Sequence, residues 1–232
     1  MIIERDKAFR LVCNIRTPVG EGNVITGTGM FVSSNNEEFL VTAGHVVEKS
    51  NLNTFIVLAD DYSNPIRVKL SELVGNNKWQ YHKEADLAVI KLVSTENNIT
   101  LLANRCLPID HINLEKDCVS RDFELTSIGF PHGLGLEGKF SPLTYRSYAS
   151  SSFLTLLRAD KKGLSVFFCL ENPSVGGYSG CPVFDLGYLY NGVMRVQRGE
   201  TKCHGFTHGT MSDDTGGKIA LITPAYYLRD LV

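Results

Sequence analysis

Short apolar runs recur along the chain, and clusters of Gly, Asn, Asp and Pro separate them. The runs have the length of strands and are rich in Val, Ile, Phe and Leu, which is typical of β-structure. Strands are expected at residues 9–15, 27–33, 39–42, 54–59, 67–74, 87–92, 123–129, 153–157, 165–170, 182–185, 192–197 and 218–222. Amphipathic helices do not alternate with these runs, so a parallel α/β sheet is not expected. The pattern predicts an all-β protein built from barrels or sandwiches.

Helical signals are few. Thr223 and Pro224 precede an apolar segment as a possible N-cap and a first helical residue, so a short C-terminal helix is expected. Residues 43–49 are expected to form one helical turn. A weakly patterned polar stretch, residues 94–117, joins the two halves, and we place a domain boundary there, with one domain over 1–107 and the other over 108–232.

Bulk composition excludes several classes of function. The 232 residues are 43% hydrophobic and 21% charged, with a formal net charge of -2. No charge excess favours binding to nucleic acid or to an anionic membrane, and no apolar run is long enough to span a bilayer. The N-terminal residues do not resemble a secretory signal. The six cysteines are scattered, which favours reduced thiols over a disulfide framework and predicts a cytoplasmic protein.

Three segments supply the groups that a serine nucleophile needs. Ser179 lies in Gly-Gly-Tyr-Ser-Gly-Cys-Pro-Val, where glycines let backbone N–H groups converge on one point. His45 follows an apolar run in Val-Thr-Ala-Gly-His-Val-Val, and Asp86 precedes another in Ala-Asp-Leu-Ala-Val-Ile. A serine hydroxyl is a weak nucleophile at neutral pH, so it requires a base, and the base requires a group that fixes its orientation. Each segment alone is weak, but their order along the chain favours a shared catalytic role.

The order His, Asp, Ser and these three contexts resemble the trypsin-like (chymotrypsin-fold) serine peptidases, in motif style the bacterial HtrA-type protease domains without a PDZ module. Three further segments strengthen the resemblance: Gly-Thr-Gly-Met-Phe-Val from residue 27, Gly-Phe-Pro from residue 129 and Ile-Thr-Pro from residue 222. The resemblance implies two six-stranded antiparallel β-barrels, with the active site in the cleft between them. The first barrel would carry His45 and Asp86, and the second Ser179.

The resemblance also implies a mechanism. Ser179 would attack a peptide carbonyl, His45 would accept and return the proton, and Asp86 would orient His45. The N–H groups of Gly177 and Ser179 would form the oxyanion hole. The substrate would be a protein or peptide, and neither a metal nor another cofactor would be required.

The chain departs from the family pattern beside the nucleophile. Tyr178 replaces the acid that pairs with a new N-terminus in activated trypsins, so activation by propeptide removal is not expected. Cys181 replaces a glycine and is expected to be a packing residue. At the position where trypsins carry an acid that selects Arg or Lys stands Pro173. The segment 192–197 resembles the strand that pairs with substrate, which suggests Arg195 and Val196 as further substrate-binding residues.

A second cluster of potential ligands lies at residues 203–208. Cys203, His204 and His208 have the side chains of a partial metal site, but their Gly- and Thr-rich surroundings favour a surface loop.

The leading hypothesis is a serine endopeptidase that works through an acyl-enzyme. One alternative is a non-catalytic relative that uses the same cleft to bind protein. Another is a peptidase restrained until a regulatory protein partner remodels the loop around Ser179.

Overall fold

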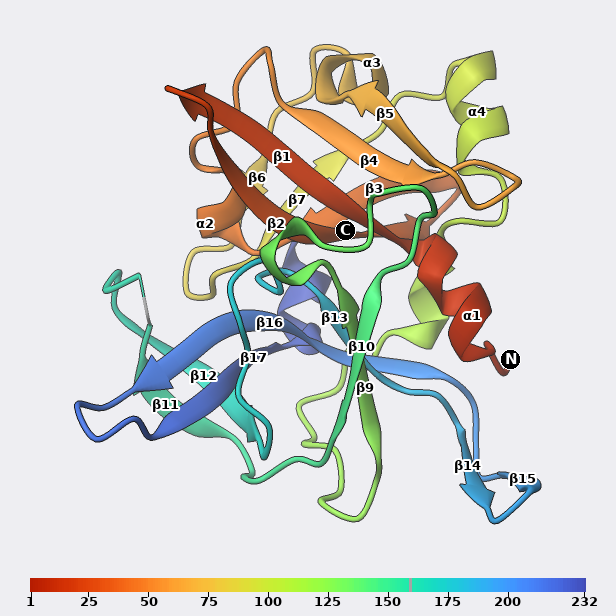
Figure 1. Cartoon of the computed structure of the whole chain (residues 1–232). Coiled ribbons are helices and arrows are strands. Elements are labelled where there is room, and N and C mark those ends of the chain that lie inside the picture. The colour runs from red at the N-terminus through yellow and green to blue at the C-terminus, as the bar shows by residue number, and fades with distance from the viewer. Residues whose placement is uncertain (159) are drawn as a thin grey trace.

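The strands form two antiparallel sheets, one from each half of the chain (Figure 1). The computed structural model describes residues 1–158 and 160–232. The first sheet has the order β5-β4-β1-β2-β3-β7-β6, and β8 pairs in parallel with β2. Its strands are β1 (Val12–Gly20), β2 (Asn23–Ser34), β3 (Glu37–Thr42), β4 (Phe55–Ala59), β5 (Pro65–Lys69), β6 (Gln80–Tyr81), β7 (Ala88–Lys91) and β8 (Leu107–Pro108).

The second sheet has the order β10-β9-β13-β16-β17-β12-β11. Its strands are β9 (Leu125–Gly129), β10 (Leu143–Ser147), β11 (Leu154–Leu157), β12 (Leu164–Leu170), β13 (Pro182–Asp185), β16 (Lys202–Ser212) and β17 (Lys218–Pro224). A separate hairpin of β14 (Tyr188–Asn191) and β15 (Met194–Gln197) projects from this half. Within the described residues the two sheets therefore hold eight and seven strands rather than the six and six expected, and their hydrogen-bonded ladders do not close into rings.

Helices are short and lie between strands. They are α1 (Arg5–Ala8), η1 (Phe9–Leu11), α2 (Gly44–Val47), α3 (Leu70–Val74), α4 (Glu96–Leu102), η2 (Ile109–His111), η3 (Pro131–Gly133) and η4 (Ala225–Asp230), where η marks a 3-10 helix. The helical turn after residue 43 and the C-terminal helix are confirmed, the latter as a 3-10 helix.

The structure differs from the expected elements at two places outside the site. The strand expected at 67–74 ends at Lys69 and continues as α3, because Leu70, Leu73 and Val74 turn one apolar face into the core. The polar stretch 94–117 contains α4, where the Thr95 hydroxyl caps the helix by accepting from the N–H of Asn98 at 3.2 Å.

The largest hydrophobic cluster crosses between the two sheets. It includes Met30 and Val41 from the first sheet and Ile128 and Phe206 from the second. The N-terminal segment also packs on the other half, since the N–H of Ile3 donates to the Thr201 hydroxyl at 2.8 Å. The sheets are thus held face to face through a shared core, and the boundary at 107/108 stays a prediction.

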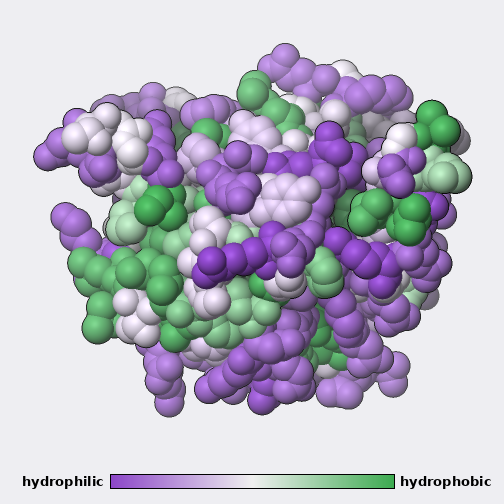
Figure 2. Space-filling model, turned by 90° about the horizontal axis from the view of Figure 1, so that it is seen from below, coloured by the Kyte–Doolittle hydropathy of each residue, from purple (hydrophilic) through white to green (hydrophobic). Residues whose placement is uncertain are grey.

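The surface is mostly polar, with an apolar area on one side of the face seen from below (Figure 2). The β11–β12 hairpin leaves Leu154, Leu157 and Leu164 exposed. Among the described residues no helix has both the length and the apolar character needed to cross a membrane.

Candidate active site

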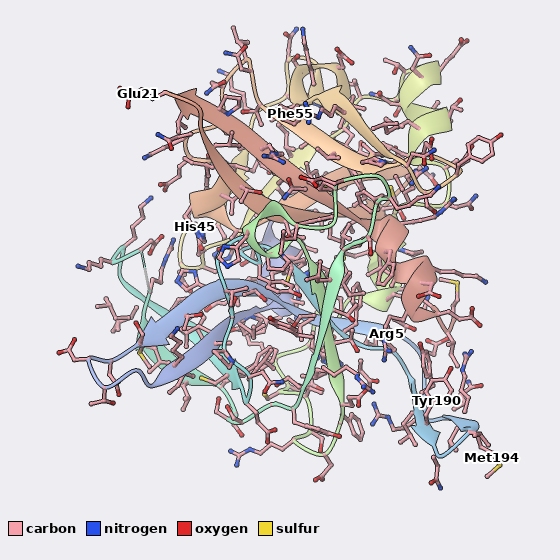
Figure 3. All side chains as sticks on the ribbon, in the orientation of Figure 1. Arg5, Glu21, His45, Phe55, Tyr190 and Met194 are labelled. Carbon is pink, nitrogen blue, oxygen red and sulfur yellow. The ribbon has the colours of Figure 1, made fainter. Side chains whose placement is uncertain are left out.

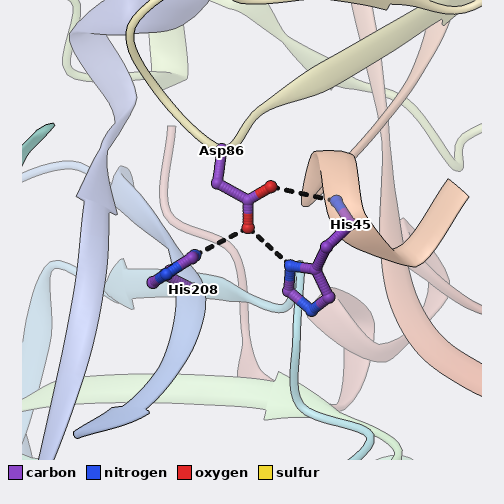
Figure 4. Close-up of side chains that lie close together, drawn as sticks. All are labelled: His45, Asp86 and His208. Carbon is purple, nitrogen blue, oxygen red and sulfur yellow. Dashed lines mark hydrogen bonds and ion pairs between the residues drawn. The ribbon is translucent and has the colours of Figure 1, made fainter. Parts of the chain in front are cut away.

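His45 and Asp86 lie close together because one follows and the other precedes two neighbouring strands. β3 pairs with β7 so that Thr42 lies opposite Ala88. The chain leaves β3 into α2, which carries His45, and Asp86 lies two residues before β7 begins. The result is a double contact: His45 Nδ1 lies 2.5 Å from Asp86 Oδ2, and the His45 backbone N–H donates to Asp86 Oδ1 at 2.9 Å (Figure 4). The predicted base and carboxylate are therefore hydrogen-bonded to each other.

The Asp86 carboxylate is fully enclosed and fully hydrogen-bonded. Oδ2 accepts from His45 Nδ1 and from His208 Nδ1, which lies 2.6 Å away. Oδ1 accepts from the His45 backbone and from Arg158 Nη2 at 3.4 Å. Burial by itself raises the pKa of Asp86, but the hydrogen bonds from His208 and His45 outweigh it and hold that pKa well below its ordinary value. Asp86 is consequently an anion at neutral pH.

Ser179 sits in the loop between β12 and β13, and backbone bonds fix that loop to both sheets. Its carbonyl accepts from the N–H of Thr28 in β2 at 2.9 Å, and the next residue, Gly180, donates to the Thr207 carbonyl in β16 at 2.7 Å. Gly180 has φ +82°, and a Cβ there would overlap Thr42 Oγ1. Only glycine permits this close approach between the halves.

Ser179 and His45 face one cavity of about 360 Å³. Its lining is formed by His45, Asp160, Ser174, Val175, Gly176, Ser179, His208, Gly209 and Thr210. Ser179 Oγ donates to the His208 carbonyl at 3.4 Å, and the described residues give it no bond to His45. Serine χ1 has three staggered wells, so rotation about one bond redirects Oγ within the cavity. Catalytic hydrogen bonds often tighten only when substrate binds.

The backbone before Ser179 forms a turn that contains the N–H groups expected to form the oxyanion hole. The N–H of Tyr178 donates to the Val175 carbonyl at 3.1 Å, which closes a turn with Gly177 at φ +96°. The Gly176 carbonyl accepts from the N–H of His132 at 2.7 Å. A trans peptide points its C=O and N–H in opposite directions, so the N–H of Gly177 points away from His132. Within residues 1–158 and 160–232, neither Gly177 N–H nor Ser179 N–H has an acceptor.

The side chain of Tyr178 anchors this loop to β10. Its side chain is buried, its hydroxyl donates to the Leu143 carbonyl at 3.1 Å, and its ring lies 5.1 Å from that of Tyr145. Burial raises the pKa of Tyr178, so the hydroxyl stays a neutral donor. Next to the site Cys181 is also buried, and burial raises its pKa to about 12. Both departures from the family pattern are thus packing positions in this fold.

The three residues expected to bind substrate do not line the cavity. Pro173 borders a small neighbouring space of about 20 Å³. Arg195 and Val196 lie on the projecting β14–β15 hairpin, where Arg195 pairs with Glu4 at 3.1 Å and stacks on the ring of Tyr188. Figure 3 shows His45 between the two sheets and Met194 at the far end of the hairpin. The expectation for Arg195 and Val196 is therefore corrected, and the strand that passes Ser179 is β16.

Sequence reasoning did not place His208 beside Asp86. The surface loop expected at residues 203–208 is instead part of β16, and His208 is only 2% exposed. The expectation was wrong because the apolar partners of this Gly-rich segment are distant in sequence: the ring of Phe167 stacks on that of His208 with centroids 5.1 Å apart. The side chain of His208 forms a hydrogen bond with Asp86, and not with Cys203 or His204.

His45, Asp86 and His208 together offer one ligand atom each, all within 4.8 Å of one another, and so could hold a metal ion. The two nitrogens lie 2.5 and 2.6 Å from the shared oxygen. Two ligands of one tetrahedral ion, each at about 2.0–2.1 Å, would stand roughly 3.3 Å apart. The observed spacing is that of hydrogen bonds, and a metal would require the cluster to expand.

Comparisons with known proteins agree with this geometry. The family model for the trypsin-like peptidase domain matches residues 27–188, a range that includes His45, Asp86 and Ser179. A search of curated protein sequences found no match.

Solved structures show the same fold at low sequence identity. Deg5 is 18% identical with a TM-score of 0.57, covering 94% of this chain and 85% of its own. The thermostable serine protease AL20, from an extremophilic microorganism, is 15% identical with a TM-score of 0.54 over 94% and 93% of the two chains. The scabies mite inactivated protease paralogue S-I1 is also 15% identical, with a TM-score of 0.55 over 97% and 93%. These likenesses confirm the predicted chymotrypsin-like fold.

Proposed function

Because the chain belongs to the trypsin-like peptidase family, we propose that it is a serine endopeptidase with Ser179 as nucleophile, His45 as base and Asp86 as orienting carboxylate. The observation that carries the proposal is the hydrogen bond between His45 Nδ1 and Asp86 Oδ2. It requires the proton on Nδ1, since an ionised carboxylate can only accept. That leaves Nε2 of His45 as the acceptor available to a serine hydroxyl.

The proposed reaction proceeds through two tetrahedral intermediates. Ser179 Oγ forms a bond to the substrate carbonyl carbon while its proton passes to His45 Nε2, and the carbonyl electron pair moves onto oxygen. The N–H groups of Gly177 and Ser179 bind that oxyanion, and Asp86 stabilises the imidazolium. Collapse breaks the C–N bond, and His45 protonates the leaving amine. Water then attacks the acyl-enzyme by the same route, which releases the acid and restores Ser179.

The cavity supports a peptide as the substrate class. It is open to solvent, and an extended peptide would lie along β16, whose residues His208–Thr210 line one wall. We therefore expect a protein or peptide substrate. A regulatory partner stays a prediction of the sequence, but the orientation of the Gly176–Gly177 peptide argues that no partner is required to form the oxyanion hole.

One observation favours the alternative of a non-catalytic binding module. Ser179 Oγ is directed to the His208 carbonyl at 3.4 Å instead of to His45. The fold does not distinguish a peptidase from a binding module, because a serine protease and an inactivated protease paralogue are both among the structural neighbours. Activity must be measured.

The test is hydrolysis of a fluorescently quenched peptide library by purified wild-type protein, Ser179→Ala and a control, Ser150→Ala. Ser150 lies in the same half but outside the cavity. We expect turnover by the wild type and the control, and none by Ser179→Ala, with all three melting at similar temperatures. Equal turnover by wild type and Ser179→Ala would refute the proposed role of Ser179. No turnover by any protein, with all three folded, would favour the binding module.

A further inference from the structure

His208 is the extra residue of a β-bulge next to the active site. β16 pairs with β17 so that Thr207 lies opposite Ile222 and Gly209 opposite Leu221, and His208 is the residue inserted between these two pairs. A bulge of this kind bends a strand and redirects a side chain, and bulges concentrate beside active sites. Here it turns the imidazole of His208 inward, to Asp86, rather than along the alternating pattern of the strand (Figure 4).

We propose that His208 is a positioning residue of the catalytic site: its imidazole shares Asp86 Oδ2 with His45, and it fixes the carboxylate that orients the base. The inference rests on the proposed function. It differs from the triad itself in that the carboxylate serves two imidazoles, one carried by α2 in the first half of the chain and one by β16 in the second sheet.

Hydrogen-bond counting determines the protonation of both rings. A carboxylate has about four acceptor positions, and Asp86 uses four, two on each oxygen. Since the anion cannot donate, both Nδ1 atoms must carry protons. His208 therefore holds Oδ2 at a fixed angle, and the same oxygen then selects the Nδ1–H tautomer of His45, which catalysis requires.

The rings themselves are held in place. His208 stacks on Phe167 at an interplanar angle of 29°, and its ring meets that of His45 edge to face, with centroids 5.8 Å apart. The backbone of His208 also contributes, because its carbonyl accepts from Ser179 Oγ. One residue thus contacts the nucleophile through its main chain and the carboxylate through its side chain.

The charged groups around Asp86 come from both halves of the chain. The titratable or charged side chains around Asp86 in the described residues are His45, His208, Arg158 and Asp160, and Arg158 is itself paired with Asp160. When His45 becomes an imidazolium during turnover, Asp86 supplies its counter-charge. A second imidazolium at His208 would compete with it for the same oxygen.

The experiment compares three variants with the wild type. His208→Ala removes the donor, and His208→Asn restores an N–H near the place of Nδ1 without a titrating ring. His111→Ala is the matched control, since His111 is also a buried histidine, bound through Nδ1 to the Thr201 carbonyl at 2.9 Å, but outside the cavity. For each we would measure kcat and KM separately between pH 5 and pH 9, the melting temperature, and low-field imidazole N–H resonances by proton NMR.

We expect His208→Ala to lower kcat at least tenfold with KM changed less than twofold. Its acid limb of kcat/KM should move to higher pH, because Asp86 then presents its whole charge to His45. His208→Asn should recover most of kcat and the wild-type acid limb. His111→Ala should lower the melting temperature alone. A His208→Ala protein with wild-type kcat and pH profile would overturn the inference.

The NMR arm, which adds the variant His45→Ala, separates this inference from the proposed function. In the folded wild type, two low-field N–H signals are expected, one lost in His45→Ala and the other in His208→Asn. This result needs no turnover, so it holds even if the chain proves inactive. The spectrum of His208→Asn also tests the shared carboxylate if His208→Ala fails to fold. A wild-type spectrum with a single such signal, unaffected by His208→Asn, would refute the shared carboxylate.

Discussion

Replacement of Gly177 by alanine tests the oxyanion hole most sharply. Gly177 has φ +96°, and a Cβ placed on it would overlap the Phe130 carbonyl oxygen and lie 2.7 Å from the backbone N of His132. Both are backbone atoms and cannot yield like a flexible side chain. The 176–177 peptide must therefore rotate, which breaks the bond between the His132 N–H and the Gly176 carbonyl and swings the Gly177 N–H away from the oxyanion.

The expected magnitude follows from these losses. A positive φ costs a residue with a Cβ about 1–2 kcal/mol, and the broken hydrogen bond costs about 1 kcal/mol, so the free energy of unfolding should fall by roughly 2–3 kcal/mol. Loss of one oxyanion donor should lower kcat by about 10²–10³-fold. KM should change little, because the donor acts on charge that develops in the transition state.

The assay is steady-state hydrolysis of a peptide found by the library screen, combined with denaturant unfolding. Gly138→Ala is the matched control, since Gly138 has φ +73° but open space where a Cβ would lie. It should lose about 1–2 kcal/mol of stability and keep the wild-type kcat. A Gly177→Ala protein with kcat within threefold of the wild type would refute the assignment of Gly177 to the oxyanion hole.

Three further substitutions test the supports of the site. Thr28 Oγ1 donates to the Gly177 carbonyl at 2.9 Å and accepts from the Phe130 N–H at 3.1 Å, so Thr28→Val should cost about 2–4 kcal/mol of unfolding free energy and lower kcat; an unchanged melting temperature would contradict this. Tyr178→Phe loses only the bond to the Leu143 carbonyl and should cost about 1 kcal/mol with kcat nearly unchanged; a loss of turnover would show that the hydroxyl does more than anchor the loop. Because the pKa of Asp86 is lowered by folding, its charge stabilises the protein above the ordinary carboxyl pKa of about 3.9, and that contribution is lost as pH falls through the folded value. Asp86→Asn should therefore be less stable than the wild type by about 2–3 kcal/mol at pH 7, with a difference that shrinks below pH 4 in urea titrations; a constant difference would refute the argument.

The positions of the proposed catalytic residues could be predicted from sequence because each lies in a local context that reports its placement. His45 follows the apolar part of β3, Asp86 precedes the apolar part of β7, and Ser179 lies among glycines whose conformations the turn requires. His208 could not be found in this way. Its proposed role depends on a bulge in the pairing of β16 with β17 and on stacking against Phe167. Neither a shift in strand register nor a stacking partner distant in sequence can be read from the residues around His208.

The same reasoning explains the errors outside the site. Residues 192–197 have the composition of a strand, and part of them do form β15, but sequence does not reveal that this strand pairs only with β14 in a projecting hairpin. Arg195 is oriented there by Glu4, almost two hundred residues earlier. In α4, the apolar residues are too few to show helical periodicity, and the Thr95 cap and the buried Asn98 side chain hold the helix instead.

The central claim is that an imidazole activates the Ser179 hydroxyl. Its most direct test is covalent labelling by a fluorophosphonate, with the modified residue located by mass spectrometry, in the wild type and in His45→Ala. The account predicts stoichiometric labelling at Ser179 in the wild type and labelling slower by at least a thousandfold in His45→Ala. Labelling of Ser179 at equal rates in both folded proteins would contradict it.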